Sequence, residues 1–348
     1  DDIDPAQTDD DYPGKQFNAV TYTGTGSNGN NVTGLGFEPD LVWFKNRSNG
    51  GGAYKNNLAD TTRGVTKVLY SDADSAEDTN GDITSFDSDG FTVGGSGTYV
   101  NASSQNYVAW CWRANGGTTA SNTDGSITST VQANTKAGFS IITYTGTGSN
   151  ATIGHGLSSA PDFFIVKDRG RSGESWNSYH TSLGATKYLV LNTNAAPATN
   201  SNRWNNTEPT STTIGLGTND NTNGSSTYLC YAWHAVEGYS KFGTYEGNGN
   251  SDGPFIYMGF RPRLVVIKAV DSNQAWYVTD TERETFNPLG EKMLSWNDSH
   301  AEFDPSGFNF DVVSNGIKIR SSDTNINSSA TFIYMAWGDV PFKYNNTF

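Results

Sequence analysis

The chain has 348 residues and a formal net charge of −14, with 34% hydrophobic and 13% aromatic residues. This acidic balance argues against a nucleic-acid partner, because phosphate binding requires an excess of Lys and Arg, and against an anionic membrane surface. No stretch approaches the roughly 20 apolar residues of a membrane-spanning helix, so we expect no membrane insertion.

Residues 1–15 form an acidic arm that we expect to lie outside the folded units. The arm begins without an initiator Met and has no signal-peptide pattern. We therefore expect the chain to be a piece of a longer or processed protein.

The next segment, residues 16–115, alternates short apolar runs with turns rich in Gly, Asn, Ser and Thr. Such a pattern predicts many short strands packed as an antiparallel β-sandwich of the jelly-roll or lectin-like kind. The run Leu41–Phe44 is apolar on both faces, which is typical of a central strand. Strands or hairpins are predicted, in order, at Phe17–Thr23, Leu41–Lys45, Lys67–Tyr70, Phe86–Phe91 and Tyr107–Trp112.

The same unit returns twice. Val20–Asn28 recurs almost unchanged as Ile142–Asn150 and, diverged, as Gly243–Asn250. In every copy a Pro and then a Lys follow the Tyr at fixed offsets: Pro39 and Lys45, Pro161 and Lys167, Pro262 and Lys268. Fixed offsets in three copies predict an all-β chain of three tandem units, at 16–115, 138–237 and 238–348. Residues 116–137 are predicted to be a linker, in which Ile127 and Val131 could anchor a short strand.

Two short motifs also recur inside the units. The hairpin predicted at Phe86–Phe91 has an apparent counterpart at Phe303–Phe308. Cys111 and Cys230 lie in equivalent segments but at different positions, whereas a framework disulfide would repeat with the unit. We therefore expect both cysteines to be buried free thiols.

Motifs for nucleotide or zinc chemistry are weak. Gly24–Gly29 matches the dinucleotide fingerprint in letters, but no helix can follow it, so a Gly-rich turn is the better interpretation. The histidines share no motif and none has a helical i, i+4 partner, which favours structural roles. They are His155, His180, His234 and His300.

Carboxylates gather in one loop of the first unit, at Asp72, Asp74, Asp78 and Asp82. Calcium prefers such oxygen clusters, but the spacing differs from an EF-hand and the other copies lack the cluster. The alternatives are a calcium site and a solvated acidic loop, and no other cofactor is expected.

Hydrolysis of a glycan would need two carboxylates held at a defined separation. Glu174, Glu208 and Glu284 lie in loops and are possible members of such a pair, but no motif marks them. No G-x-S-x-G nucleophile motif is present. We therefore expect no catalytic residues.

Four tryptophans stand in polar, loop-like surroundings: Trp176, Trp204, Trp276 and Trp296. A flat ring beside Asn, Asp or Arg can stack on a sugar while the amides bind its hydroxyls. These rings are the predicted ligand-binding residues. The alternative is that they close the ends of the sandwiches, since Trp176 and Trp276 fall at similar places in their copies.

A lysine recurs in every unit, at Lys45, Lys167 and Lys268. One interpretation is a shared charge that anchors a ligand. The other, which we favour, is a lysine that ends a buried strand and discourages pairing at an edge.

Several runs of the chain together resemble a repeated domain of unknown function in virion proteins of marine tailed phages. They are Gly36–Arg47, Thr84–Phe91, Tyr107–Trp112, Ser126–Thr135 and Ala137–Tyr144. The resemblance covers nearly all of units one and two. Unit three departs from it, with Glu246 in place of the turn Thr and Arg263 in place of the Asp after Pro.

The resemblance implies a virion surface protein, in a tail fibre or a capsid appendage, and supplies no catalytic residues. We expect a non-enzymatic protein that attaches the particle to a host-surface glycan or receptor. It would fold in the host cytoplasm, bind other virion proteins and form a homo-oligomer, a trimer if it belongs to a fibre. The alternatives are a secreted or cell-surface lectin-like protein and, third, a polysaccharide depolymerase.

Overall fold

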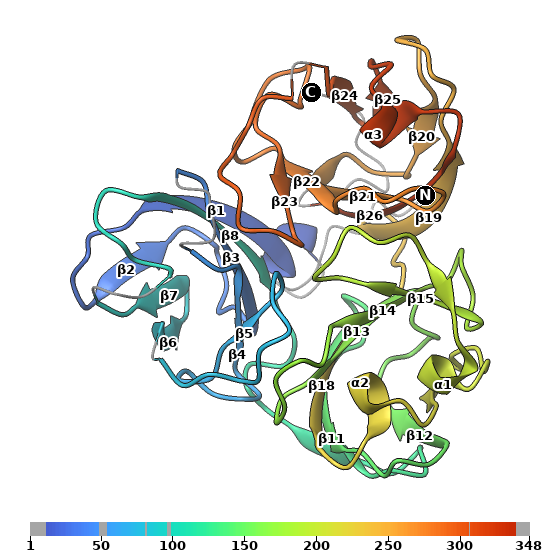
Figure 1. Ribbon diagram of the computed structural model, residues 1–348. Coiled ribbons are helices and arrows are strands. Elements are labelled where there is room, and N and C mark those ends of the chain that lie inside the picture. Colours follow the sequence, from blue (N-terminus) through green and yellow to red (C-terminus); the bar gives the residue numbers. More distant parts are fainter. Residues whose placement is uncertain (1–11, 49–53, 81, 96–98, 306, 339–348) are drawn as a thin grey trace, which may run out of the picture.

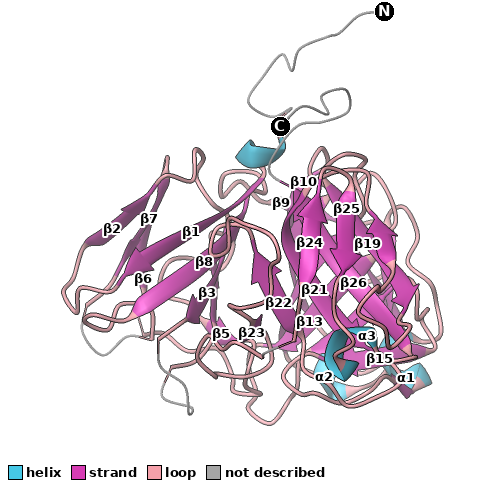
Figure 2. Cartoon of the chain, turned by 90° about the horizontal axis from the view of Figure 1, so that it is seen from above, coloured by secondary structure: helices cyan, strands magenta, loops and turns pink. Residues whose placement is uncertain are grey.

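The computed structural model describes residues 12–48, 54–80, 82–95, 99–305 and 307–338 (Figure 1). Nearly all regular structure in these residues is β-strand in antiparallel sheets (Figure 2), which confirms the predicted fold class. Most of the predicted acidic arm lies outside the described residues, and its end forms the short 3-10 helix η2 (Pro13–Lys15). No helix in the described ranges is long and apolar enough to cross a membrane.

Unit one consists of a five-stranded and a three-stranded sheet. The larger sheet has the order β1 (Phe17–Thr23), β8 (Asn106–Trp112), β3 (Leu41–Asn46), β4 (Asn57–Asp60), β5 (Leu69–Tyr70). The smaller sheet has the order β2 (Asn30–Thr33), β7 (Gly90–Val93), β6 (Ile83–Asp87).

Unit two has the same central strand order, extended at both edges to eight strands. The larger sheet runs β16 (Ala198–Thr199), β15 (Lys187–Val190), β14 (Asn177–His180), β13 (Phe163–Asp168), β18 (Thr227–Trp233), β11 (Phe139–Thr145), β10 (Ser129–Asn134), β9 (Ala120–Asn122). Its smaller sheet pairs β12 (Ala151–Gly154) with β17 (Thr213–Leu216); the short helix α1 (Ser201–Trp204) precedes β17 and the short helix α2 (Asp220–Asn223) follows it. Strands β9 and β10 come from the segment predicted as a linker, which therefore continues this sheet.

Unit three repeats the arrangement of unit one. The larger sheet runs β19 (Ser240–Glu246), β26 (Thr331–Gly338), β21 (Pro262–Ala269), β22 (Tyr277–Asp280), β23 (Leu294–Ser295). The smaller sheet runs β20 (Phe255–Tyr257), β25 (Gly316–Ile319), β24 (Phe310–Val313), and the helix α3 (Thr324–Asn327) precedes β26. In all three units the first long strand pairs with the last, and the last pairs with the strand that carries the recurrent lysine.

The hairpin predicted in unit one is present, since Phe86 pairs with Phe91. Its predicted counterpart at Phe303–Phe308 is wrong, because Phe303 instead forms an isolated bridge with Met293. The equivalent hairpin of unit three joins β24 to β25, where Val313 pairs with Gly316.

The larger sheets are buried on both faces, and side-chain alternation along a strand assigns each face to a different core. On β8, Ala109 and Cys111 pack in a core that belongs to unit one alone, between its two sheets. Val108, Trp110 and Trp112 point the other way, into a core shared by all three units. Strands β18 and β26 divide their side chains in the same way.

The shared core lies where the three units meet, and in Figure 1 they surround this common centre. At its middle, Trp112, Trp233 and Trp337 contact one another edge to face. Ring centroids are 5.9 Å apart for Trp112 and Trp233, 5.4 Å for Trp112 and Trp337, and 5.9 Å for Trp233 and Trp337. Each pair has the favourable T-shaped geometry, with interplanar angles of 63°, 77° and 68°. The three rings come from the last strands of the three units, so a single cluster joins all of them.

The repeated Gly-rich turn is held by a buried asparagine in every unit. The Oδ1 of Asn101 accepts a hydrogen bond from the Thr25 N–H at 2.9 Å, and its Nδ2 donates to the Ser27 carbonyl at 2.8 Å. Asn223 and Asn327 make the matching contacts in units two and three. A Cβ at Gly24 would come within 2.2 Å of the Ala102 carbonyl oxygen, so only Gly fits there. The turn motif is thus explained by the fold.

Both cysteines are buried and free, which confirms the sequence prediction. Burial raises the pKa of Cys111 and of Cys230 above the ordinary thiol value, so both thiols are protonated at neutral pH.

We expect Trp233→Ala to lower the free energy of unfolding by about 3–5 kcal/mol, since it removes one ring of the central cluster and leaves a cavity. All three units should unfold in a single transition, because they share that core. Urea unfolding, followed by fluorescence and by circular dichroism, measures the change in free energy and the number of transitions. Phe255→Ala, at an exposed ring, should change stability by less than about 0.5 kcal/mol. Separate transitions for the units would contradict the shared core.

Candidate functional site

The four tryptophans predicted to bind sugar are all buried. Their exposed fractions are 0% for Trp176 and Trp276 and 1% for Trp204 and Trp296, so no ring presents a face to solvent. The expectation of exposed rings is therefore wrong. Trp176, Trp276 and Trp296 lie in the shared core, and Trp204 lies in the core of unit two. Their polar neighbours misled the sequence interpretation, because each ring packs on residues distant in sequence while the chain around it stays at the surface.

The recurrent lysines are also buried, and each reaches from its own unit to the next. Lys45 Nζ donates to the Asp298 carbonyl of unit three. Lys167 Nζ lies 3.3 Å from the Asp74 carbonyl of unit one, and Lys268 Nζ lies 3.4 Å from the Asn194 carbonyl of unit two. Burial lowers the pKa of all three from 10.5 to about 8. Lys167 and Lys268 also donate to a carbonyl of their own unit, those of Asp168 and Ala269, both at 2.8 Å. The buried lysines thus bind backbone oxygens at the interfaces, which is neither an edge-strand role nor an exposed anchor for a ligand.

The four aspartates proposed for calcium have separate partners. Asp72 accepts a hydrogen bond from the Asn56 N–H, and Asp78 accepts one from the Tyr70 hydroxyl. The Asp82 carboxylate is bonded to Asn57, and burial raises its pKa to about 6, while Asp74 meets Lys167 through its carbonyl. Within the described ranges no three His, Cys, Asp or Glu residues are grouped so that they could hold a metal ion.

Two of the three glutamates considered for hydrolysis accept hydrogen bonds from groups of their own unit. Glu208 accepts hydrogen bonds from the Tyr179 hydroxyl at 2.6 Å and the Ala185 N–H at 2.7 Å. Glu284 is 7% exposed and accepts from two consecutive N–H groups, those of Gly290 and Glu291. Glu174 is half-buried in unit two. Glu208 and Glu284 therefore lie in different units.

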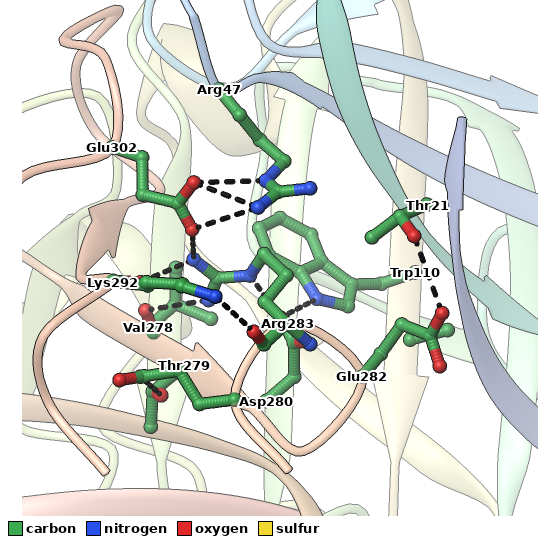
Figure 3. A network of polar contacts seen from close by, with 12 residues as sticks. Thr21, Arg47, Trp110, Val278, Thr279, Asp280, Glu282, Arg283, Lys292 and Glu302 are labelled. Atoms are coloured by element: carbon green, nitrogen blue, oxygen red, sulfur yellow. Dashed lines mark hydrogen bonds and ion pairs between the residues drawn. The ribbon is translucent and has the colours of Figure 1, made fainter. Parts of the chain in front are cut away.

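The interface between units one and three contains a chain of charged groups (Figure 3). Arg47 of unit one binds Glu302 of unit three, with Nε and Oε2 3.0 Å apart. Glu302 also contacts Arg283 at 3.1 Å, and Arg283 binds Asp280 at 2.6 Å. Asp280 then accepts a hydrogen bond from the Trp110 indole N–H of unit one at 3.0 Å. The network therefore begins and ends in unit one.

The interface between units two and one has the same network at equivalent positions. Arg169 of unit two binds Glu77 of unit one at 2.8 Å, and Glu77 contacts Arg63 at 3.2 Å. Arg63 binds Asp60, which accepts a hydrogen bond from the Tyr231 hydroxyl of unit two at 2.6 Å. Burial alone would raise the pKa of Glu77, but its hydrogen bonds and ion pairs to Arg169 and Arg63 lower it below the ordinary value.

The third interface, between units three and two, replaces the charges by apolar side chains. Val270 stands where the other units have Arg47 and Arg169, two residues after the recurrent lysine, and Leu183 stands where they have Arg63 and Arg283. Both pack against the shared core. His180 occupies the position of the aspartates, and burial lowers its pKa to about 4.

A surface hollow of about 510 Å³ lies in unit three beside the network of Figure 3. It is mostly apolar, with aromatic side chains from β22 and from the loop after β23. Its lining residues are Ala275, Tyr277, Ser295, Asp298, His300, Ala301, Glu302 and Phe303. Two of the tryptophans predicted from the sequence are direct neighbours of lining residues: Ala275 and Tyr277 flank Trp276, and Ser295 precedes Trp296.

The hollow depends on a small side chain that is specific to unit three. The third residue after the equivalent lysines Lys67, Lys187 and Lys292 is Tyr70 in unit one, Val190 in unit two and Ser295 in unit three. In unit one the large ring of Tyr70 stands at this position, buried and in T-shaped contact with Tyr99. The side chain of Ser295 is much smaller. Comparison of the three copies at this position is the sequence signal that could have identified the hollow.

The polar groups of the hollow lie at its wall and mouth. Asp298 Oδ1 is 3.1 Å from His300 Nδ1 and 3.9 Å from Lys45 Nζ. The His300 side chain is 75% exposed, in contrast to the other three histidines, which are buried. Glu302 is already bound by two arginines. The arrangement can bind a small ring by stacking and by hydrogen bonding, and it brings together no pair of free carboxylates.

The chain is similar to one known protein family. The family model described as a domain of unknown function, DUF7483, matches residues 12–341, which include all three units. No curated protein matches the chain, and no solved structure matches it.

The buried lysines predict a pH dependence of stability. Lys167 has a pKa of about 8 when folded and 10.5 when unfolded, so the unfolded chain binds more protons across this window and stability rises with pH. Between pH 8 and 9, the free energy of unfolding of the wild type should rise by roughly 1 kcal/mol relative to that of Lys167→Met. Urea unfolding at several pH values measures this difference. Lys187→Met, at an exposed lysine, is the control, and an equal difference for both variants would contradict the prediction.

Proposed function

The chain belongs to the DUF7483 family, whose function is unknown. We propose that the chain is a non-enzymatic surface protein of a tailed-phage virion. It would be part of a tail fibre or a capsid appendage and would attach the particle to host-surface glycan. The runs that resemble virion proteins of marine tailed phages support this proposal. They include Gly36–Arg47 and Ser126–Thr135.

The hollow of unit three is the observation that carries the attachment part of the proposal. It is an open, partly aromatic site on the surface of unit three. Aromatic walls with a few polar groups are typical of sites that bind small ligands and sugars.

The scaffold suits display on a particle. Three units that share one core hold the hollow at a fixed position, so a ligand would bind without reordering of the units. Many copies on a symmetric particle would combine weak single contacts into firm attachment. The acidic surface keeps neighbouring copies from associating nonspecifically.

Immunogold labelling of intact particles tests the proposal, with an antibody raised against this chain. We expect label on tail fibres or on head appendages, and the antibody should slow adsorption of the particles to host cells. Particles without the label, with the chain recovered only in the medium, would contradict the virion role and favour the secreted lectin. Release of reducing ends from host polysaccharide by the purified chain would contradict the non-enzymatic role.

A further inference from the structure

We propose that the hollow of unit three binds one ring of a neutral or amino sugar and discriminates against sugars that carry a carboxylate. This inference rests on the proposed attachment function and names the ligand class of that site. It follows from the volume of the hollow, from its aromatic walls and from which polar atoms face it.

The walls of the hollow suit the apolar face of a sugar ring. Tyr277 and Phe303 line it, and Phe303 is 37% exposed, so its ring is accessible from solvent. The Tyr277 hydroxyl is turned away toward Asn325 at 3.3 Å, which leaves the ring as its contribution to the hollow. A volume of about 510 Å³ is within the range of sites for small ligands and fits a sugar ring with the rest of the glycan outside.

The hydroxyl of Ser295 marks the polar end of the site. Ser295 is only 3% exposed and lines the hollow, and its hydroxyl has no hydrogen-bond partner among the residues that the structure describes. The hydroxyl is therefore left to bond to solvent or to a ligand hydroxyl. Units one and two have no such group, since Tyr70 and Val190 stand there.

Asp298 supplies a hydrogen-bond acceptor. Its Oδ1 is engaged by the His300 N–H at 3.1 Å and the His300 ring. Its Oδ2 accepts no hydrogen bond from the described part of the chain and is left for a ligand. A carboxylate oxygen accepts hydrogen bonds strongly from hydroxyl and, above all, from ammonium groups.

The nearby cations face away from the hollow. Lys45 is 1% exposed and donates to a backbone carbonyl, and the Arg283 side chain is 0% exposed. Arg47 and Arg283 both bind Glu302, so their charge is already paired. His300, the one basic side chain among the lining residues, is already paired with Asp298, so a ligand carboxylate would meet the Asp298 charge without a cation of its own, which is repulsive. This arrangement favours donors and disfavours anions.

The test measures binding of methyl glycosides to the full chain by ligand-observed NMR. The probes are methyl glucoside, methyl glucosaminide and methyl glucuronide. We expect binding of the first two and at least tenfold weaker binding of the glucuronide. Equal or tighter binding of the glucuronide, or binding of none of the three, would overturn the inference.

Ser295→Tyr locates the binding site. It introduces the residue that unit one has at this position, fills the hollow and should weaken binding at least tenfold. Phe303→Ala is a second variant with the same expectation, in case the first does not fold. Tyr257→Ala is the matched control, an exposed aromatic on β20 outside the hollow, and should bind as the wild type does. Unchanged binding by folded Ser295→Tyr or Phe303→Ala would overturn the assignment to the hollow.

Asp298→Asn tests the charge argument. It should weaken binding of the glucosaminide several-fold and reduce the discrimination against the glucuronide, with little change for the glucoside. Unaltered discrimination would overturn the role of Asp298. Labelled particles combined with no sugar binding would overturn this inference alone, whereas sugar binding without particle association would overturn the virion role alone.

Discussion

The contact among Trp112, Trp233 and Trp337 is the interaction on which the rest of the structure depends. Each ring lies at or next to the end of the last strand of its unit, which pairs on both sides within the larger sheet, so the cluster fixes where the three sheets converge. Sheets with two apolar faces need a cover on each, and the smaller sheet of a unit covers only one. The other face is covered by the two neighbouring units, so no unit completes its burial alone.

Around this cluster the three interfaces are alike in geometry and differ in chemistry. Two of them carry Arg–Glu–Arg–Asp networks, and the third uses Val270 and Leu183 at the same positions. Buried ion pairs cost desolvation that their attraction only partly offsets, so the apolar version is not expected to be weaker. The networks instead demand specific partners, which favours the correct pairing of similar units. Unit three also differs from the other two units at Ser295, where the small side chain lines the hollow.

Much of the fold could be predicted from the sequence, because it follows from local patterns. The strands around Phe17–Thr23 and Leu41–Lys45, the turn at Gly24 and the free thiols all depend on residue type and spacing. The error over the tryptophans arose because their partners are distant in sequence. Trp296 has polar neighbours but packs on Trp43 of another unit, at 4.1 Å between centroids. The motif at Phe303 resembled a hairpin in letters, whereas pairing with Met293 depends on the local packing of unit three. The sequence interpretation reached only residues adjacent to the hollow, because the small side chain of Ser295 stands out only when the three copies are compared position by position.

The shared core has a consequence for how the protein is assembled. A ring of three separate subunits would fall apart on dilution, because its stability depends on subunit concentration. Here the three units lie on one polypeptide, so their association is intramolecular and the ring closes at any concentration. A single copy on a particle far from any other is therefore as stable as a copy in a crowded host cell.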